Sequence, residues 1–112
     1  MIRLFKETPT FTKKIESIGD ESLLRTIQDA ILEDPNVGNT VAGTGGLKKF
    51  RVPDPSRGKG KRGGLRVVYL DLADREVTYL LYLYGKDEAE DLTSDEKKAL
   101  KNLVNSIKGE RQ

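Results

Sequence analysis

Cationic side chains form the densest chemical grouping in this sequence. Between residues 48 and 66 a single acid, Asp54, stands against eight cations: Lys48, Lys49, Arg51, Arg57, Lys59, Lys61, Arg62 and Arg66. This segment therefore carries a charge of +7, whereas the chain as a whole carries +2. Because a concentrated positive field attracts negative charge, we expect a polyanion as the partner.

The sequence contains neither histidine nor cysteine. This excludes the commonest general acid–base, the commonest metal ligand, thiol nucleophiles and disulfides. Any catalysis must therefore use lysine, arginine, tyrosine, aspartate, glutamate or backbone groups. The acidic run at 87–91 is typical of a solvated segment that complements a following helix dipole. We therefore expect no metal site and no cofactor.

Glycines alternate with cations at residues 58–64, GKGKRGG. The spacing matches GxGxxG, but a dinucleotide site requires this loop to open a helix, and a strand pattern follows here. The remaining alternatives are a solvated loop and a loop that lies against an anionic ligand. We favour the second, because the charge continues onto the flanking strands through Lys49, Arg51 and Arg66.

Two tyrosines, Tyr82 and Tyr84, alternate along an apolar segment and should share one face of a strand. They fit two interpretations, ordinary core aromatics or a platform on which an unpaired base stacks. The cation Lys86 follows directly after Gly85. The pattern alone leaves both interpretations open.

Seven elements are expected to position these groups. The apolar patterns predict the strands 2–5, 47–52, 65–72 and 77–84, and helices from Thr8-Pro9 to Gly19, from Asp20 to Asp34-Pro35, and from Thr93 onward. In the strand 47–52, Phe50 and Val52 face one side and Lys49 and Arg51 the other. In the last helix, Thr93 and Glu96 form a capping box and the buried stripe comprises Leu100, Leu103, Val104 and Ile107.

The order β-α-α-β-β-β-α indicates an α+β fold, in which an N-terminal helical hairpin packs on a small, mainly antiparallel sheet. The length of 112 residues fits one domain, 1–112. No window approaches the ~20 apolar residues of a membrane span, and the N-terminus lacks a signal-peptide pattern. We expect a soluble, cytoplasmic protein without membrane contact.

Four motifs carry a family resemblance. They are DP at 34–35, GTGGLKKxR at 43–51, GKGKRGGxRxxY at 58–69 and YGKxExxDL at 84–92. In combination they resemble HigB-type toxins of the RelE/ParE superfamily over nearly the whole chain. The resemblance implies the toxin of a bacterial type II toxin–antitoxin pair, a ribosome-dependent endoribonuclease that cuts mRNA in the ribosomal A site. Its partners would be the ribosome, mRNA and a HigA-like antitoxin, with operator DNA contacted only through the antitoxin complex.

The resemblance also assigns roles to residues. The implied reaction is metal-independent attack of the RNA 2′-hydroxyl on the adjacent phosphate, which cations stabilise. Arg66 matches the family's active-site strand arginine, and Lys49 and Arg51 match its pair of strand cations. Asp87 stands where the family has an arginine, so Lys86, Tyr84 or Asp87 would serve as the additional acid–base. Lys86 ranks first, because it can both donate a proton and pair with phosphate. The RNA-binding residues would be Lys48, Arg57, Lys59, Lys61, Arg62, Tyr82 and Tyr84.

Two other functions suit the same fold. One is non-enzymatic inhibition of DNA gyrase, as in ParE-like members, and the other is a nucleic-acid-binding module without catalysis. The presence of Lys49, Arg51 and Arg66 favours the nuclease.

Overall fold

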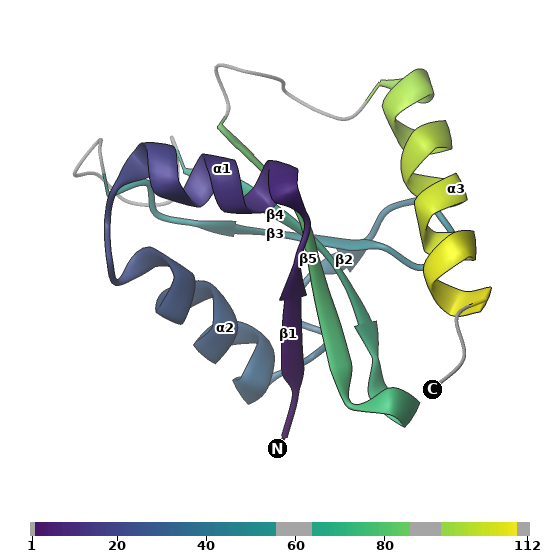
Figure 1. The fold of residues 1–112 in the computed structure, drawn as a ribbon, viewed down its shortest axis with the longest axis horizontal. Helices are drawn as coiled ribbons and strands as arrows, with labels where there is room; N and C mark the ends of the chain where they lie inside the picture. Colours follow the sequence, from purple (N-terminus) through teal and green to yellow (C-terminus); the bar gives the residue numbers. More distant parts are fainter. Residues whose placement is uncertain (1, 56–63, 86–92, 110–112) are drawn as a thin grey trace.

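A computed structural model describes residues 2–55, 64–85 and 93–109 (Figure 1). The elements in chain order are β1 (Leu4–Glu7), α1 (Pro9–Ile18), α2 (Leu23–Glu33), β2 (Asn39–Thr40), β3 (Lys48–Val52), β4 (Leu65–Leu72), the 3-10 turn η2 (Ala73–Arg75), β5 (Val77–Gly85) and α3 (Ser94–Gly109). The α+β class and the helical hairpin on a mainly antiparallel sheet are confirmed. The sequence did not predict β2, which is only two residues long.

The sheet has five strands in the order β1-β5-β4-β3-β2. β1 runs parallel to β5, and the other pairs are antiparallel. β1 begins at Leu4, two residues later than predicted, because its pairing with β5 joins Leu4 to Val77 and leaves Ile2 exposed. The central strand β4 has the predicted bounds and is buried along nearly its entire length.

Capping residues set the ends of the helical hairpin. The Thr8 hydroxyl accepts a hydrogen bond from the Phe11 N–H at 3.1 Å, and Gly19 ends α1 in the left-handed region at φ 73°. The prediction that Asp20 caps α2 is wrong, because Ser22 occupies that position. The Asp20 carboxylate instead accepts hydrogen bonds from the Ser22 hydroxyl and N–H, which lower its pKa. Asp20 therefore stabilises a turn just before α2.

The two faces of the sheet carry separate apolar clusters. α1 and α2 cover one face, where Phe11, Ile27 and Ile31 pack against residues of β3, β4 and β5. α3 covers part of the other face through Val104 and Ile107 (Figure 1). The central strands β4 and β5 therefore have one side facing the hairpin and the other facing α3.

Polar contacts form at both ends of α3. Its predicted capping box is confirmed, since the Thr93 N–H donates to the Glu96 carboxylate at 2.8 Å and the Glu96 N–H donates to the Thr93 hydroxyl at 3.1 Å. At the other end the Arg75 guanidinium donates to the last carbonyls of the helix, at 3.1 and 2.7 Å. The buried stripe is narrower than predicted, because Leu103 is 37% exposed.

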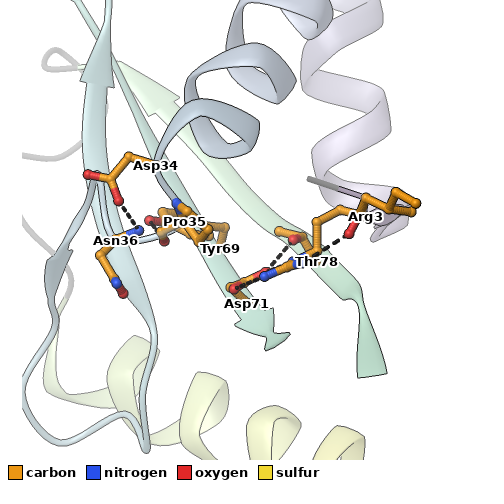
Figure 2. A network of polar contacts seen from close by, with 8 residues as sticks. Arg3, Asp34, Pro35, Asn36, Tyr69, Asp71 and Thr78 are labelled. Carbon is orange, nitrogen blue, oxygen red and sulfur yellow. Dashed lines mark hydrogen bonds and ion pairs between the residues drawn. The ribbon is translucent and has the colours of Figure 1, made fainter. Parts of the chain in front are cut away.

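A polar network fixes the first strand to the middle of the sheet (Figure 2). The Arg3 guanidinium pairs with the Asp71 carboxylate at 2.7 Å, reaching across β5 to β4. The Thr78 hydroxyl donates to the same carboxylate oxygen at 2.7 Å. These contacts therefore link β1, β5 and β4, which are neighbours in the sheet.

Among the described residues no helix is long and apolar enough to cross a membrane.

Candidate active site

Three of the predicted catalytic side chains meet at one pocket. The pocket has a volume of about 370 Å³, and its lining comprises Val37, Asn39, Lys49, Phe50, Arg51 and Arg66. Arg51 on β3 lies directly opposite Arg66 on β4 in the antiparallel register. Lys49 precedes Arg51 by two residues and shares its strand face. The structure thus gathers Lys49, Arg51 and Arg66, which are separated in the sequence by the glycine-rich loop.

The cations of this pocket differ in exposure. Arg66 is only 5% exposed, and its Nη1 donates to the Gly64 carbonyl oxygen at 2.6 Å. Lys49 is half-buried and Arg51 is exposed. A guanidinium held in a fixed orientation offers a planar set of donors that matches phosphate oxygens. The arrangement therefore suits an anion that contacts the exposed Arg51 and the buried Arg66 together.

The wall formed by Val37 and Asn39 depends on Tyr69. The Tyr69 hydroxyl donates to the Pro35 carbonyl oxygen at 2.8 Å and accepts from the Gly38 N–H at 3.0 Å. Figure 2 shows Tyr69 reaching this turn, in which the Asp34 carboxylate also accepts from the Asn36 N–H at 3.0 Å. Tyr69 therefore anchors the segment that leads into β2 and carries the pocket wall.

Gly38 allows this segment to lie against the backbone of Lys49. A Cβ atom at position 38 would lie 2.9 Å from Cε1 of Tyr69 and 3.0 Å from both the backbone nitrogen and oxygen of Lys49. Distances this short force a shift, and the backbone of a paired strand cannot rotate away as a flexible side chain can. Sequence reasoning missed Gly38, because only the pairing of β2 with β3 reveals the close approach.

The Tyr69 hydroxyl makes stability sensitive to alkaline pH. Burial raises the pKa of Tyr69; the Gly38 N–H opposes this rise, and the Asp71 and Asp34 carboxylates add to it. In the unfolded chain tyrosine ionises near pH ~10. Below that pH the contribution of the neutral hydroxyl to stability is fully present, and it is lost as pH rises through the folded pKa.

We therefore expect the free energy of unfolding to fall more steeply above pH ~10 in the wild type than in a Tyr69→Phe variant. Urea unfolding of both proteins across this pH range measures the difference. A gap between the two proteins that stays constant with pH would contradict the role of Tyr69 ionisation.

The remaining predicted residues lie elsewhere. Lys48 points to the opposite strand face from Lys49, and its Nζ donates to the Thr40 hydroxyl at 3.2 Å, so it does not line the pocket. Five predicted residues lie outside the described ranges: Arg57, Lys59, Lys61, Arg62 and Lys86.

Among the residues that are described, no three acidic side chains gather as a metal site would require.

The two strand tyrosines have different environments. Their rings lie side by side with centroids 5.3 Å apart and a tilt of 33°. Tyr82 is half-buried, whereas Tyr84 is 0% exposed. Because base stacking needs an exposed ring face, the burial of Tyr84 fits the core interpretation, and we retain only Tyr82 as a base-stacking residue.

Comparison with known proteins agrees with the fold. The family model described as the RelE toxin of the RelE / RelB toxin-antitoxin system matches residues 2–111. A mutant of E. coli toxin RelE in the free state shares the fold, with a TM-score of 0.59 and 17% sequence identity over 80% of this chain and 90% of that chain. The HigB subtype stays a prediction. Since the family model spans nearly the entire sequence, this chain belongs to the RelE toxin family and is the toxin of a toxin–antitoxin system, with an antitoxin as its partner.

Proposed function

We propose that this toxin is an endoribonuclease that cuts mRNA in the A site of the ribosome and so inhibits translation. The observation that carries the proposal is the convergence of Lys49, Arg51 and Arg66 on one pocket. A protein that only blocks a partner has no need of an arginine buried at the bottom of a pocket, where removing its charge from water is costly. If the protein instead cuts RNA, the arginine would stabilise the negative charge on the reacting phosphate.

The proposed reaction uses a nucleophile that RNA supplies. The 2′-hydroxyl loses its proton and attacks the adjacent phosphorus, and the bond to the 5′-oxygen of the next nucleotide breaks. That oxygen takes up a proton, which leaves a 2′,3′-cyclic phosphate and a free 5′-hydroxyl. Neither step requires a metal ion, because positioning and charge neutralisation supply the rate enhancement.

Each side chain of the pocket has a role in this proposal. Arg66 holds a non-bridging phosphate oxygen and stabilises the charge of the pentavalent transition state. Arg51 adds positive charge at the pocket mouth, and Lys49 transfers a proton because, unlike arginine, lysine can lose one. Lys86 is proposed as the second proton-transfer group.

The proposed partners follow from the same activity. The glycine-rich loop would hold the RNA backbone through Arg57, Lys59, Lys61 and Arg62. The antitoxin is proposed to be HigA-like, and operator DNA would be reached only through the antitoxin complex. The ribosome would present mRNA in the orientation that the reaction needs.

Primer extension on mRNA from cells in which the toxin is induced tests the proposal. We expect growth arrest together with discrete cuts inside translated reading frames. The same mapping on cells treated with a translation inhibitor controls for general RNA decay. Intact mRNA accompanied by altered plasmid supercoiling would contradict the nuclease and identify a gyrase inhibitor instead.

A further inference from the structure

Two depressions meet at Tyr82, away from the catalytic pocket. One is apolar, about 280 Å³ in volume, and lies between α3 and β5; its lining includes Leu81, Tyr82, Ala99, Leu100 and Leu103. The other has a volume of about 360 Å³ and lies beside α1; its lining comprises Thr10, Lys13, Lys14, Ser17, Tyr82 and Leu83. Thr10 and Tyr82 belong to both, so the two form one continuous surface with an apolar half and a cationic half.

The Tyr82 ring is held in place at this junction. It is half-buried, and one of its sides rests on the buried ring of Tyr84 at a centroid distance of 5.3 Å. A fixed aromatic ring beside aliphatic side chains is the surface on which nucleic-acid bases stack in single-strand-binding proteins. The two lysines on the cationic side match the charge of a phosphate.

Tyr82 lies on the same face of the sheet as the pocket cations, whereas Lys13 and Lys14 come from α1, which covers the other face, so the surface extends around β5 from one face to the other. Lys49 on β3 is paired with Val68 on β4, and Val68 is paired with Tyr82 on β5. Neighbouring strands are about 4.8 Å apart, so the backbones at Lys49 and Tyr82 are separated by about 10 Å. This separation is short enough for one RNA strand to reach both the pocket and Tyr82.

We propose that this surface is a second nucleotide subsite for single-stranded RNA. An unpaired base lies in the apolar half against Tyr82, and a phosphate of the same strand pairs with Lys13 and Lys14. The inference rests on the proposed action on RNA. Glu96 also lines the apolar half, but its carboxylate already accepts the Thr93 N–H at 2.8 Å within the capping box.

Binding of an uncleavable RNA tests the aromatic half. The probe is a fluorescent hexanucleotide with 2′-O-methyl riboses, which cannot form the attacking 2′-hydroxyl, and fluorescence anisotropy with the full chain gives its affinity. We expect Tyr82→Ala to weaken binding about tenfold, because one base loses its stacking surface. Tyr82→Phe keeps the ring and is expected to bind like the wild type. Thermal unfolding of both variants shows that each is folded.

The salt dependence of the same binding tests the cationic half. Each phosphate contact to a single strand adds about 0.7 to the slope of log affinity against log salt. Because both lysines pair with one phosphate, we expect the double substitution Lys13→Gln with Lys14→Gln to reduce that slope by about 0.7. The matched control is Lys98→Gln with Lys101→Gln, which removes two exposed lysines from the far side of α3 and should leave the slope unchanged.

The outcomes separate this subsite from the proposed function. Unchanged RNA affinity in Tyr82→Ala, together with weaker binding in Arg51→Ala, would overturn the subsite and leave the catalytic pocket supported. Loss of antitoxin binding in Tyr82→Ala without loss of RNA affinity would also overturn it, since a peptide would then be the occupant. Because the probe cannot be cut, absence of cleavage activity leaves this test intact.

Discussion

Replacing Arg66 with alanine is expected to slow mRNA cleavage by about 10²–10³-fold, which is typical when one preorganised donor to a transition-state charge is lost. The guanidinium is 5% exposed and fixed by the Gly64 carbonyl, so water cannot take its place without reorganising the pocket. Induced cells should then continue to grow. Primer extension gives the loss of cleavage, and the growth curve gives the loss of toxicity.

Two further variants make this result specific. Arg66→Lys keeps the charge but not the planar donor set, and we expect it to restore only part of the activity. Arg25→Ala removes an exposed arginine from α2 and should leave cleavage unchanged. Because Arg66 is buried, each protein is first shown to be folded by its unfolding transition. A folded Arg66→Ala protein that remains as toxic as the wild type would exclude Arg66 from the mechanism.

Replacing Gly38 with alanine is expected to reduce both stability and cleavage. The added methyl would lie 3.0 Å from the Lys49 backbone and 2.9 Å from the Tyr69 ring, and overpacking of this kind costs about 1–3 kcal/mol. The strain is relieved only if β2 moves away from β3, which displaces the wall of the pocket that Val37 and Asn39 form. Urea unfolding measures the first effect and primer extension the second.

The matched control is Gly109→Ala, because an added Cβ at Gly109 meets nothing within 4 Å. Its free energy of unfolding should be no lower than that of the wild type, since Gly109 lies in α3 and alanine favours a helix there, and its cleavage pattern should be unchanged. If Gly38→Ala also keeps wild-type stability and activity, then the β2 segment does not need its close contact with Lys49, and the pocket wall is not positioned by it.

Local signals in the sequence predicted most of the fold. Thr8-Pro9, Gly19 and the Thr93–Glu96 capping box each set a helix end through contacts within a few residues, and the structure contains all of them. β2 was missed because its two residues form a strand only by pairing with Lys48 and Lys49. The N-cap of α2 was wrongly predicted to be Asp20, because Asp20 and Ser22 lie in the same turn and both residue types favour this position.

The part of the candidate site that depends on the alternation of side chains along one strand could be predicted from the sequence. Alternation placed Lys49 and Arg51 on one face, and the structure confirms this through their shared pocket. The registers that place Arg51 opposite Arg66, and Gly38 against Lys49, depend on pairing between distant segments. Burial of Tyr84 likewise depends on what packs over β5, which no local pattern encodes.

The parallel pairing of β1 with β5 constrains when the protein can fold during its own synthesis. The Thr8 hydroxyl binds the Leu81 carbonyl oxygen at 2.7 Å across 73 residues of sequence. Contacts between such distant residues form late, since the loop between them must first be closed. The growing chain therefore cannot pair its first strand until β5 has left the ribosome. Translation that stops before β5 leaves β1 without its parallel neighbour, so the five-stranded sheet is complete only after β5 has been synthesised.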